Sequence, residues 1–186
     1  IAVDTSDKAH ISYYAHGNLA YANNTSGSWV KREIDNGGRV GQYTSIALNT
    51  SGKAYISYFD ATNTALKYAT NASGSWVRIK VDKGGDVGRH TSLALDTANK
   101  AYISYYDATN RDLKYATNAS VSWKITAVDS NGKAGKYTSI ALDTSNKAHI
   151  SYYDVANGDL RYATNTSGSW VITTVDSSGN TGEYTS

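Results

Sequence analysis

The sequence contains neither cysteine nor methionine, and the absence of cysteine excludes several kinds of site at once. Without thiols the chain cannot form disulfide bonds, bind a metal through thiolates or use a cysteine nucleophile. The fold must therefore be held together by noncovalent packing alone.

Long apolar runs and runs of like charge are also missing. No apolar segment is long enough to cross a bilayer, and no charged-then-apolar signal segment opens the chain. The 18 basic and 16 acidic residues give a formal charge of +2 and are spread along the chain, which argues against nucleic acids or other polyanions as partners. Because the chain begins at Ile1, inside a repeated phrase and without Met, we expect it to be a piece of a longer protein.

What the sequence does contain is one phrase written four times. "LKYATNASGSW", residues Leu66–Trp76, recurs in variant form before each of the other tryptophans, and the four tryptophans are 47 residues apart (76 − 29, 123 − 76, 170 − 123). A single repeat domain of 186 residues therefore divides after each recurring Thr-Ser pair into units 1–45, 46–92, 93–139 and 140–186. We expect each unit to be one supersecondary element that buries its apolar face against its neighbours.

Within a unit, apolar and aromatic side chains alternate with a period of two, which is the period of β-strands. In the fourth unit we expect strands at 139–144, 148–154, 160–164 and 170–175, joined by linkers rich in Gly, Asn, Asp and Ser. No segment shows a helical stripe. Four short antiparallel strands in a unit of this length predict an all-β fold of the β-propeller type.

The number of blades in the assembled protein stays open. Four units could close into a four-bladed ring, form half of an eight-bladed ring with a second chain, or belong to a longer array. Ser186 followed by Ile1 would recreate the internal junctions between units, so each end offers the surface that the other end needs. Such ends either close a ring or propagate as a filament.

The phrases "SIALDTSNKAHISYYDVANGDLRYA" and "SWVITTVDSSGNTGEYTS" resemble the blades of tandem-repeat β-propellers in exported bacterial and archaeal proteins. The resemblance extends over the whole chain. It implies a propeller fold and an extracellular or cell-surface location. It implies little about activity, because this fold serves many functions.

A fainter similarity is to the Asp-box turn of sialidase-like propellers, S-x-D-x-G-x-[ST]-W. Asn165 stands at the Asp position and Ser169 precedes Trp170, whereas Ser167 replaces the Gly and Ala163 the leading Ser. The similarity implies a turn of this kind and no sialidase chemistry, because the box is an element of the fold and not of the catalytic site.

An Asn-x-Ser sequence occurs at the same place in every unit. In an exported protein this pattern accepts an N-linked glycan on a surface loop. The four matches descend from one ancestral match and therefore count as one indication. The candidate glycosylation sites are Asn24, Asn71, Asn118 and Asn165.

The histidines and acidic turns do not favour a metal site. His10 and His149 replace a tyrosine of the other units, and His90 does so at a second position, so both positions favour a flat amphipathic ring over a zinc ligand. The acidic turns at 82–86 and 129–132 do not complete a calcium-binding loop. We expect neither a metal nor a cofactor.

The carboxylates do not favour an enzyme. Asp60, Asp107 and Asp154 are repeat-equivalent, whereas glycoside hydrolysis needs two carboxylates in different environments that converge on one bond. The sequence also lacks a Gly-x-Ser-x-Gly motif and a phosphate-binding loop. We therefore expect no catalytic residues.

Aromatic residues beside variable polar residues are the best candidates for ligand binding. One such residue per unit lies before the Thr-Ser junction, where we expect the Gly-rich turn and the "DATN" turn to share one face of the blade. Aromatic rings suit sugar faces, and several weak sites gain avidity; packing between blades is the alternative role. The candidates are Tyr43, His90, Tyr137 and Tyr184.

Taken together, these features favour a noncatalytic extracellular structural or adhesive surface module. Glycosylation, and assembly with copies of itself or with neighbouring repeats, would fit this role. The alternative is a multivalent carbohydrate-binding, lectin-like propeller with glycans as partners. A sialidase-like glycoside hydrolase ranks last, and neither nucleic acid nor a membrane span is expected.

Overall fold

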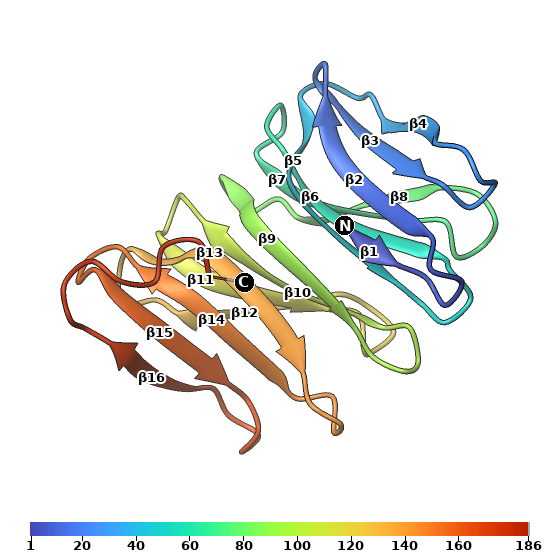
Figure 1. Ribbon diagram of the computed structural model, residues 1–186. Helices are drawn as coiled ribbons and strands as arrows, with labels where there is room; N and C mark the ends of the chain where they lie inside the picture. The colour runs from blue at the N-terminus through green and yellow to red at the C-terminus, as the bar shows by residue number, and fades with distance from the viewer. Residues whose placement is uncertain (186) are drawn as a thin grey trace.

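The computed structural model describes residues 1–185 and contains four antiparallel sheets of four strands each (Figure 1). We call the sheets blades 1 to 4, and the strands in each follow one another in chain order. Blade 1 comprises β1 (Ala2–Val3), β2 (Ala9–Ala15), β3 (Asn18–Asn23) and β4 (Val30–Asp35); blade 2 comprises β5 (Val40–Leu48), β6 (Ala54–Asp60), β7 (Ala65–Thr70) and β8 (Val77–Asp82). Blade 3 comprises β9 (Val87–Leu95), β10 (Ala101–Asp107), β11 (Asp112–Thr117) and β12 (Lys124–Asp129); blade 4 comprises β13 (Ala134–Leu142), β14 (Ala148–Asp154), β15 (Asp159–Thr164) and β16 (Val171–Asp176). The all-β, propeller-type fold predicted from the sequence is confirmed.

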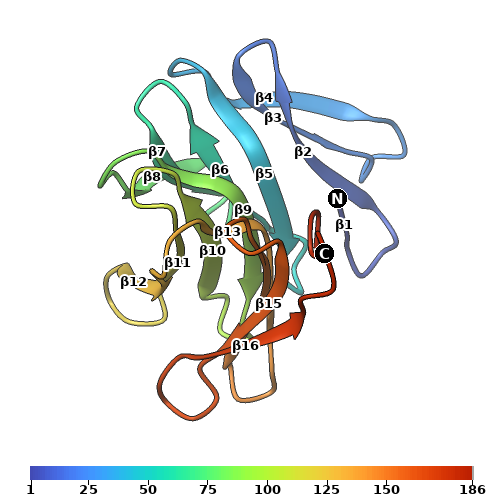
Figure 2. The same cartoon turned by 90° about the vertical axis from the view of Figure 1, so that its left-hand side faces the viewer.

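The blades stand side by side, with the first strand of each on the inner side of an arc. β9 lies against both β5 and β13, and β5 also lies against β2 of blade 1. Over residues 1–185 the four sheets follow the arc without closing into a ring (Figures 1 and 2). The described residues contain no helix that could cross a membrane.

The core lies between neighbouring blades and not inside any one of them. All seven residues of β6 and of β10 are buried, because the middle blades are covered on both faces. At the first interface, Leu19 and Ile34 of blade 1 pack against Ile56 and Tyr58 of blade 2. This arrangement explains why apolar and aromatic residues occupy both faces of the predicted strands.

The first strand of each blade differs from the prediction. In the fourth unit it was expected at 139–144, but β13 runs from Ala134 to Leu142, so the Thr-Ser junction lies inside the strand and not before it. The strand passes through a bulge at Tyr137, where the φ angle is +52° and the register with β14 shifts. The unit boundaries at 45, 92 and 139 thus cut inner strands and do not separate blades.

A glycine before each bulge brings the inner strand against the preceding blade. A Cβ atom at Gly135 would lie 2.6 Å from the Cα atom of Leu113 in blade 3, and its φ angle is +100°. Only glycine combines this backbone conformation with so close an approach. The glycines in this stretch therefore set the distance between blades.

Candidate functional site

The four aromatic candidates lie in one continuous row along the inner side of the arc. We call this row, Tyr43, His90, Tyr137 and Tyr184, the aromatic ladder. Successive ring centroids are 4.6, 4.5 and 4.3 Å apart. Each residue has a positive φ angle, between 52° and 60°, which turns its side chain towards the neighbouring blade.

The ladder opens onto a shallow groove of about 270 Å³ that is also lined by Thr44, Thr91, Thr138 and Thr185. Part of the ring surface is used in packing. Tyr43, His90 and Tyr137 each contact the next ring in the row and a second ring behind it, whereas Tyr184 at the end of the row is 73% exposed. Tyr43, for example, lies 6.2 Å from Phe59 and 4.6 Å from His90. The alternative role of these residues, packing between blades, is therefore present in the structure, and their role in binding stays a prediction.

His90 is held in its neutral form. Burial disfavours the imidazolium, and the nearby charges of Lys136 and Arg89 act in the same direction, so the pKa of His90 falls to about 4. A neutral ring can take the place of tyrosine in the stack. This explains why histidine and tyrosine alternate at this position.

A second kind of site lies between blades, where sequence analysis placed no ligand-binding candidate. At every interface a tyrosine of one blade packs edge-on against the tryptophan of the next blade. The three pairs are Tyr21 with Trp76 at 5.2 Å, Tyr68 with Trp123 at 5.2 Å, and Tyr115 with Trp170 at 5.1 Å between ring centroids.

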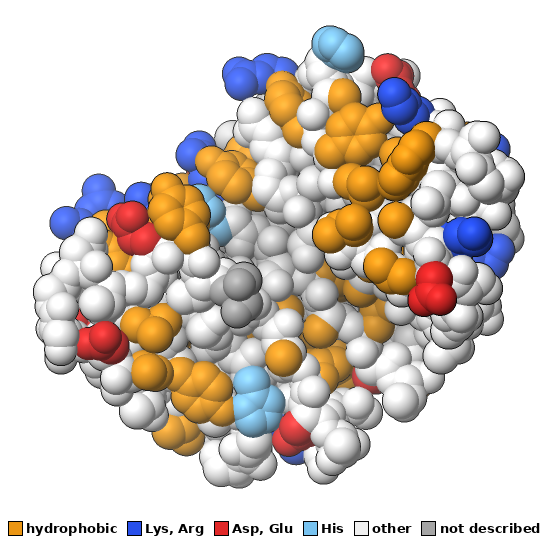
Figure 3. All heavy atoms as spheres, viewed as in Figure 1, with side chains coloured by type: hydrophobic (Ala, Val, Ile, Leu, Met, Phe, Trp, Pro, Cys, Tyr) orange, Lys and Arg blue, Asp and Glu red, His pale blue; other side chains and the backbone are white. Residues whose placement is uncertain are grey.

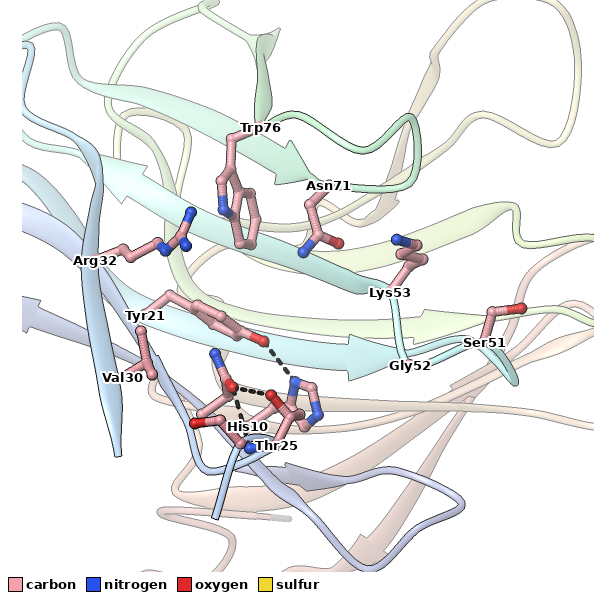
Figure 4. Close-up of a pocket in the computed structure, with 12 residues that line it drawn as sticks. His10, Tyr21, Thr25, Val30, Arg32, Ser51, Gly52, Lys53, Asn71 and Trp76 are labelled. Atoms are coloured by element: carbon pink, nitrogen blue, oxygen red, sulfur yellow. Dashed lines mark hydrogen bonds between the residues drawn. The ribbon is translucent and has the colours of Figure 1, made fainter. Parts of the chain in front are cut away.

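Beside the first of these pairs is a recess of about 330 Å³, which we call the N-terminal recess (Figure 4). Arg32 of β4 and Tyr21 of β3 line it from blade 1, and Lys53, Asn71 and Trp76 line it from blade 2. Figure 4 shows Arg32 and Trp76 on the same side of the Tyr21 ring, with Lys53 at the far edge of the recess. Two aromatic rings and two cations thus border one hollow.

The floor of the N-terminal recess is held rigidly by a buried hydrogen-bond chain. His10 Nδ1 lies 2.5 Å from the Tyr21 hydroxyl, and His10 Nε2 lies 3.2 Å from Asp4 Oδ2. Since a carboxylate can only accept, the Nε2–H donates to Asp4 and the Tyr21 hydroxyl donates to Nδ1. Burial and the charge of Asp4 raise the pKa of Tyr21, so its hydroxyl stays protonated and fixed.

A recess of about 390 Å³ lies at the interface of blades 3 and 4, and we call it the C-terminal recess. Tyr115 and Lys124 line it from blade 3, and Asn165 and Trp170 line it from blade 4. It shares the aromatic pair and the asparagine with the N-terminal recess, but Thr126 stands where the other has Arg32. The two recesses are thus related but chemically distinct.

The sequence did contain a signal for these recesses. Most residues that line them are repeated, such as Tyr21, Asn71 and Trp76, but a few lining positions differ between units. Arg32 of the first unit corresponds to Ile79 in the second and to Thr126 and Thr173 in the third and fourth. Comparing the units for divergence, and not only for identity, would have found this position.

The asparagines of the candidate glycosylation sites have a structural role. In each unit the side-chain oxygen accepts a hydrogen bond, 2.7 or 2.8 Å long, from the backbone N–H of the alanine that begins the second strand of the blade. Asn71 and Asn165 also line the two recesses. Glycosylation at Asn24, Asn71, Asn118 and Asn165 stays a prediction, and a glycan on Asn71 would fill the N-terminal recess.

The repeated carboxylates do not converge on one point. Asp60, Asp107 and Asp154 are each buried at the end of a second strand, where they accept hydrogen bonds from their own turn. Each also faces a cation of its own blade; the Lys114 ammonium, for example, lies 3.6 Å from Asp107. Across residues 1–185 no group of three or more His, Asp or Glu side chains is placed to hold a metal ion.

No protein-family model matches the chain, and no curated protein sequence matches it. Several solved structures do. The chain is similar to a NanB sialidase from Streptococcus pneumoniae, with 13% identity and a TM-score of 0.56, over 83% of this chain and 27% of the sialidase. It is also similar to the Aleuria aurantia lectin in complex with Fucalpha1-6GlcNAc, with 12% identity and a TM-score of 0.60, over 92% of this chain and 62% of the lectin.

A third similarity is to a polysaccharide lyase, the PL25 ulvan lyase bound to a GlcA–Rha3S unit. Here the identity is 12% and the TM-score is 0.59, over 92% of this chain and 56% of the lyase. The chain spans less than two thirds of each of these three proteins. At such low identity the likeness is one of architecture, and it shows that the four sheets are blades of the propeller type.

Proposed function

We propose that the chain is a noncatalytic carbohydrate-binding module whose interblade recesses hold sugars. The observation that carries this proposal is the repeated placement of a fixed Tyr–Trp pair beside an asparagine in a recess of 330 to 390 Å³. An apolar ring next to hydrogen-bonding side chains matches the apolar face and the hydroxyls of a sugar ring, and this volume lies in the usual range of ligand pockets, about 300–1,000 Å³.

The recesses suit a sugar better than the aromatic ladder does. The ladder rings contact one another at 4.3 to 4.6 Å, so a ligand would have to compete with their own stacking. Tyr43 and Tyr184 are more exposed but lie on a shallow groove, whereas Trp76 and Trp170 are half-buried in more enclosed recesses. The similarity to a sialidase, to a lectin in complex with Fucalpha1-6GlcNAc and to a polysaccharide lyase also supports a carbohydrate ligand.

Two recesses on one rigid chain would act together on a polymeric glycan. Once one site is occupied, the second binds at an effective concentration of about millimolar, so two weak sites gain roughly 10²-fold or more in avidity. We propose an extracellular or cell-surface location, where such polymers are met. The burial and pairing of the repeated carboxylates support the noncatalytic part of the proposal.

A glycan-array screen followed by titration tests this function. Binding should quench the fluorescence of Trp76 and should be weakened at least fivefold by Trp76→Phe, which removes part of the ring surface but keeps an aromatic side chain. Trp29→Phe is the matched control, because Trp29 occupies the same place in its repeat but lies on the open face of blade 1. Absence of selective binding in the array and in titration at millimolar sugar would contradict the proposal.

A second role, self-assembly as a structural surface module, is supported by the two open faces of the arc. On blade 1, Ile11, Tyr13, Ala22 and Trp29 line an open hollow, and the apolar side chains gathered over this sheet are visible in Figure 3. The corresponding residues of blade 2 are covered by blade 1. Trp29 is consequently 51% exposed.

The other end of the arc offers the matching surface. Val175 of blade 4 is 60% exposed, whereas the equivalent Val81 and Val128 are 9% and 8% exposed because the next blade covers them. We propose that a second copy binds head to tail, with its blade 1 against blade 4 of the first. This contact would be weaker than an internal interface, because Ala20 replaces the lysine found at Lys67 and Lys114 and leaves Asp176 without a cation.

Native mass spectrometry over a range of concentrations tests the assembly. We expect multiples of 20.0 kDa that increase with concentration. Trp29→Ser and Val175→Lys, which change opposite faces, should each shift the distribution towards the monomer. A monomer at all concentrations, or variants without effect, would contradict head-to-tail binding.

A further inference from the structure

The N-terminal recess combines a guanidinium from one blade with an ammonium from the next. Arg32 lines it from blade 1 and Lys53 from blade 2. At the next interface the position of Arg32 is taken by Ile79, and at the third by Thr126. A lysine is common to these interfaces as Lys53, Lys100 and Lys147, and Lys124 also lines the C-terminal recess. What distinguishes the first interface is therefore the arginine and not the number of cations.

Both cations of this recess are available to a ligand. Three other cations between blades are paired with carboxylates. Lys67, Lys114 and Arg161 each contact two aspartates. Within residues 1–185, by contrast, no ion pair involves Arg32 or Lys53.

Asp4, the carboxylate in the hydrogen-bond chain beneath the recess, does not pair with Arg32 or Lys53. Asp4 is not among the residues that line the hollow, and its oxygens accept from the backbone N–H groups of Ser6 and Lys8 and from His10. These hydrogen bonds, led by the one from Lys8, keep the pKa of Asp4 below its ordinary value. The charge of Asp4 is thus directed at its own turn and at His10.

We propose that the N-terminal recess binds an acidic sugar, a uronate or a sulfated residue, through Arg32 and Lys53; this rests on the carbohydrate-binding function proposed above. The planar guanidinium of Arg32 donates two parallel hydrogen bonds to a carboxylate or sulfate, and Lys53 adds a point charge from the opposite blade. The Trp76 ring covers the apolar face of the sugar. Asn71 and Ser51 at the rim supply partners for its hydroxyls.

The site recognises a single acidic residue within a glycan and not a continuous polyanion. The recess is lined by two cations, Arg32 and Lys53, which suffice for one acidic group and are too few for a row of them. One acidic group held by two cations also predicts a modest salt dependence, because only these two ion-pair contacts are screened.

Isothermal titration with two matched disaccharides tests this inference. The probes are a glucuronate-containing disaccharide and its neutral glucose counterpart, with a sulfated disaccharide as a third ligand. We expect at least one acidic ligand to bind five- to tenfold more tightly than the neutral one. Arg32→Ile, which installs the residue that the second unit carries at Ile79, should abolish this preference and change neutral-sugar affinity less than twofold.

Lys100→Gln is the control variant, because it removes the equivalent lysine from the second interface and should leave the preference intact. Equal affinity for acidic and neutral sugars, or an equal loss of both in Arg32→Ile, overturns the acidic-sugar inference while leaving carbohydrate binding in place. If none of the three ligands binds, the acidic-sugar inference is also overturned. The glycan array then decides whether the proposed carbohydrate-binding function fails as well.

Discussion

The buried ion network between blades 2 and 3 allows a sharp test of what holds the blades together. Lys114 Nζ lies 2.7 Å from Asp82 Oδ2 of the preceding blade and 3.6 Å from Asp107 Oδ2 of its own blade. The Tyr105 hydroxyl donates to the same Asp82 oxygen at 2.7 Å. The side chain of Lys114 is 15% exposed, and both carboxylates are buried.

Lys114→Met removes the charge and keeps most of the length of the side chain. Removing one partner of a buried ion pair costs about 3–5 kcal/mol, and the remaining hydrogen bonds to Asp82 from Tyr105 and Gly84 place this case near the lower end, at about 3 kcal/mol. For a domain of this size that corresponds to a fall in melting temperature of roughly 6–12 °C.

The pH dependence identifies the cause. Burial opposes ionisation of Asp82, but the hydrogen bonds from Lys114 and Tyr105 outweigh it, so the pKa of Asp82 lies below its ordinary value of 3.8. Its ionised form therefore stabilises the fold above about pH 4, and this contribution is lost as the pH falls through the lowered pKa. In Lys114→Met the uncompensated carboxylate can be protonated, so the difference from wild type should shrink between pH 7 and pH 3.

Urea unfolding followed by tryptophan fluorescence at both pH values measures these effects. Lys80→Met, at an exposed position on β8 that makes no ion pair within residues 1–185, is the control and should change stability by less than about 0.5 kcal/mol. Adding Asp82→Asn to Lys114→Met should recover about 1–2 kcal/mol relative to the sum of the single changes, because the two groups interact directly. A cost of Lys114→Met below about 1 kcal/mol at pH 7, or the same cost at pH 3, would refute the reasoning.

Three further outcomes can be checked on the same protein. Gly135→Ala should destabilise the fold by more than about 3 kcal/mol in urea, because its Cβ would meet the Leu113 Cα atom, whereas Gly168→Ala, with a similar φ angle but open space around it, should cost only about 1 kcal/mol. Because the pKa of His90 lies near 4 in the folded state and near 6.5 when unperturbed, stability should decline as the pH falls from about 6.5 to 4, and His90→Tyr should remove this decline; an unchanged pH profile would contradict it. Assays with chromogenic glycosides should show no hydrolysis, and turnover that is lost in Glu33→Gln would contradict the noncatalytic proposal.

Much of the fold could be predicted from the sequence because local patterns determine it. The second strand of blade 4 was expected at 148–154, and β14 has these bounds. Its neighbours β15 and β16 were placed to within one residue at each end. In these strands the period-two alternation of side chains and the turn-forming residues between strands indicate the same strand ends.

The inner strand was misplaced for a physical reason. The stretch before Tyr137 contains glycine and polar residues, which usually indicate a turn. The chain instead continues as a strand through a bulge whose tyrosine has a positive φ angle, a conformation that is uncommon for residues other than glycine. The stacking of that ring on the rings of adjacent blades compensates for the strained backbone, and this contact is invisible within one unit.

The recess was missed because its walls come from different units. Tyr21 and Trp76 are separated by more than a full repeat in the sequence and meet only when two blades pack. The aromatic ladder could be predicted because repeat-equivalent residues necessarily form a row. A pocket between units requires knowing which face of one blade meets which face of the next, and that depends on the crossing of the sheets.

The departures of the first unit from the repeat separate assembly from binding. On its uncovered face, Ala15 and Ala20 replace the aspartate and lysine of the interblade network, so this face has lost the charged part of an internal interface while keeping its aromatic part. On its covered side, Arg32 adds a charge that no other unit has at that position. Random divergence from the repeat does not account for an unpaired cation beside Trp76. We therefore propose that the first unit combines a weaker end contact with a specialised recess, and that mutations on its two sides change these properties independently.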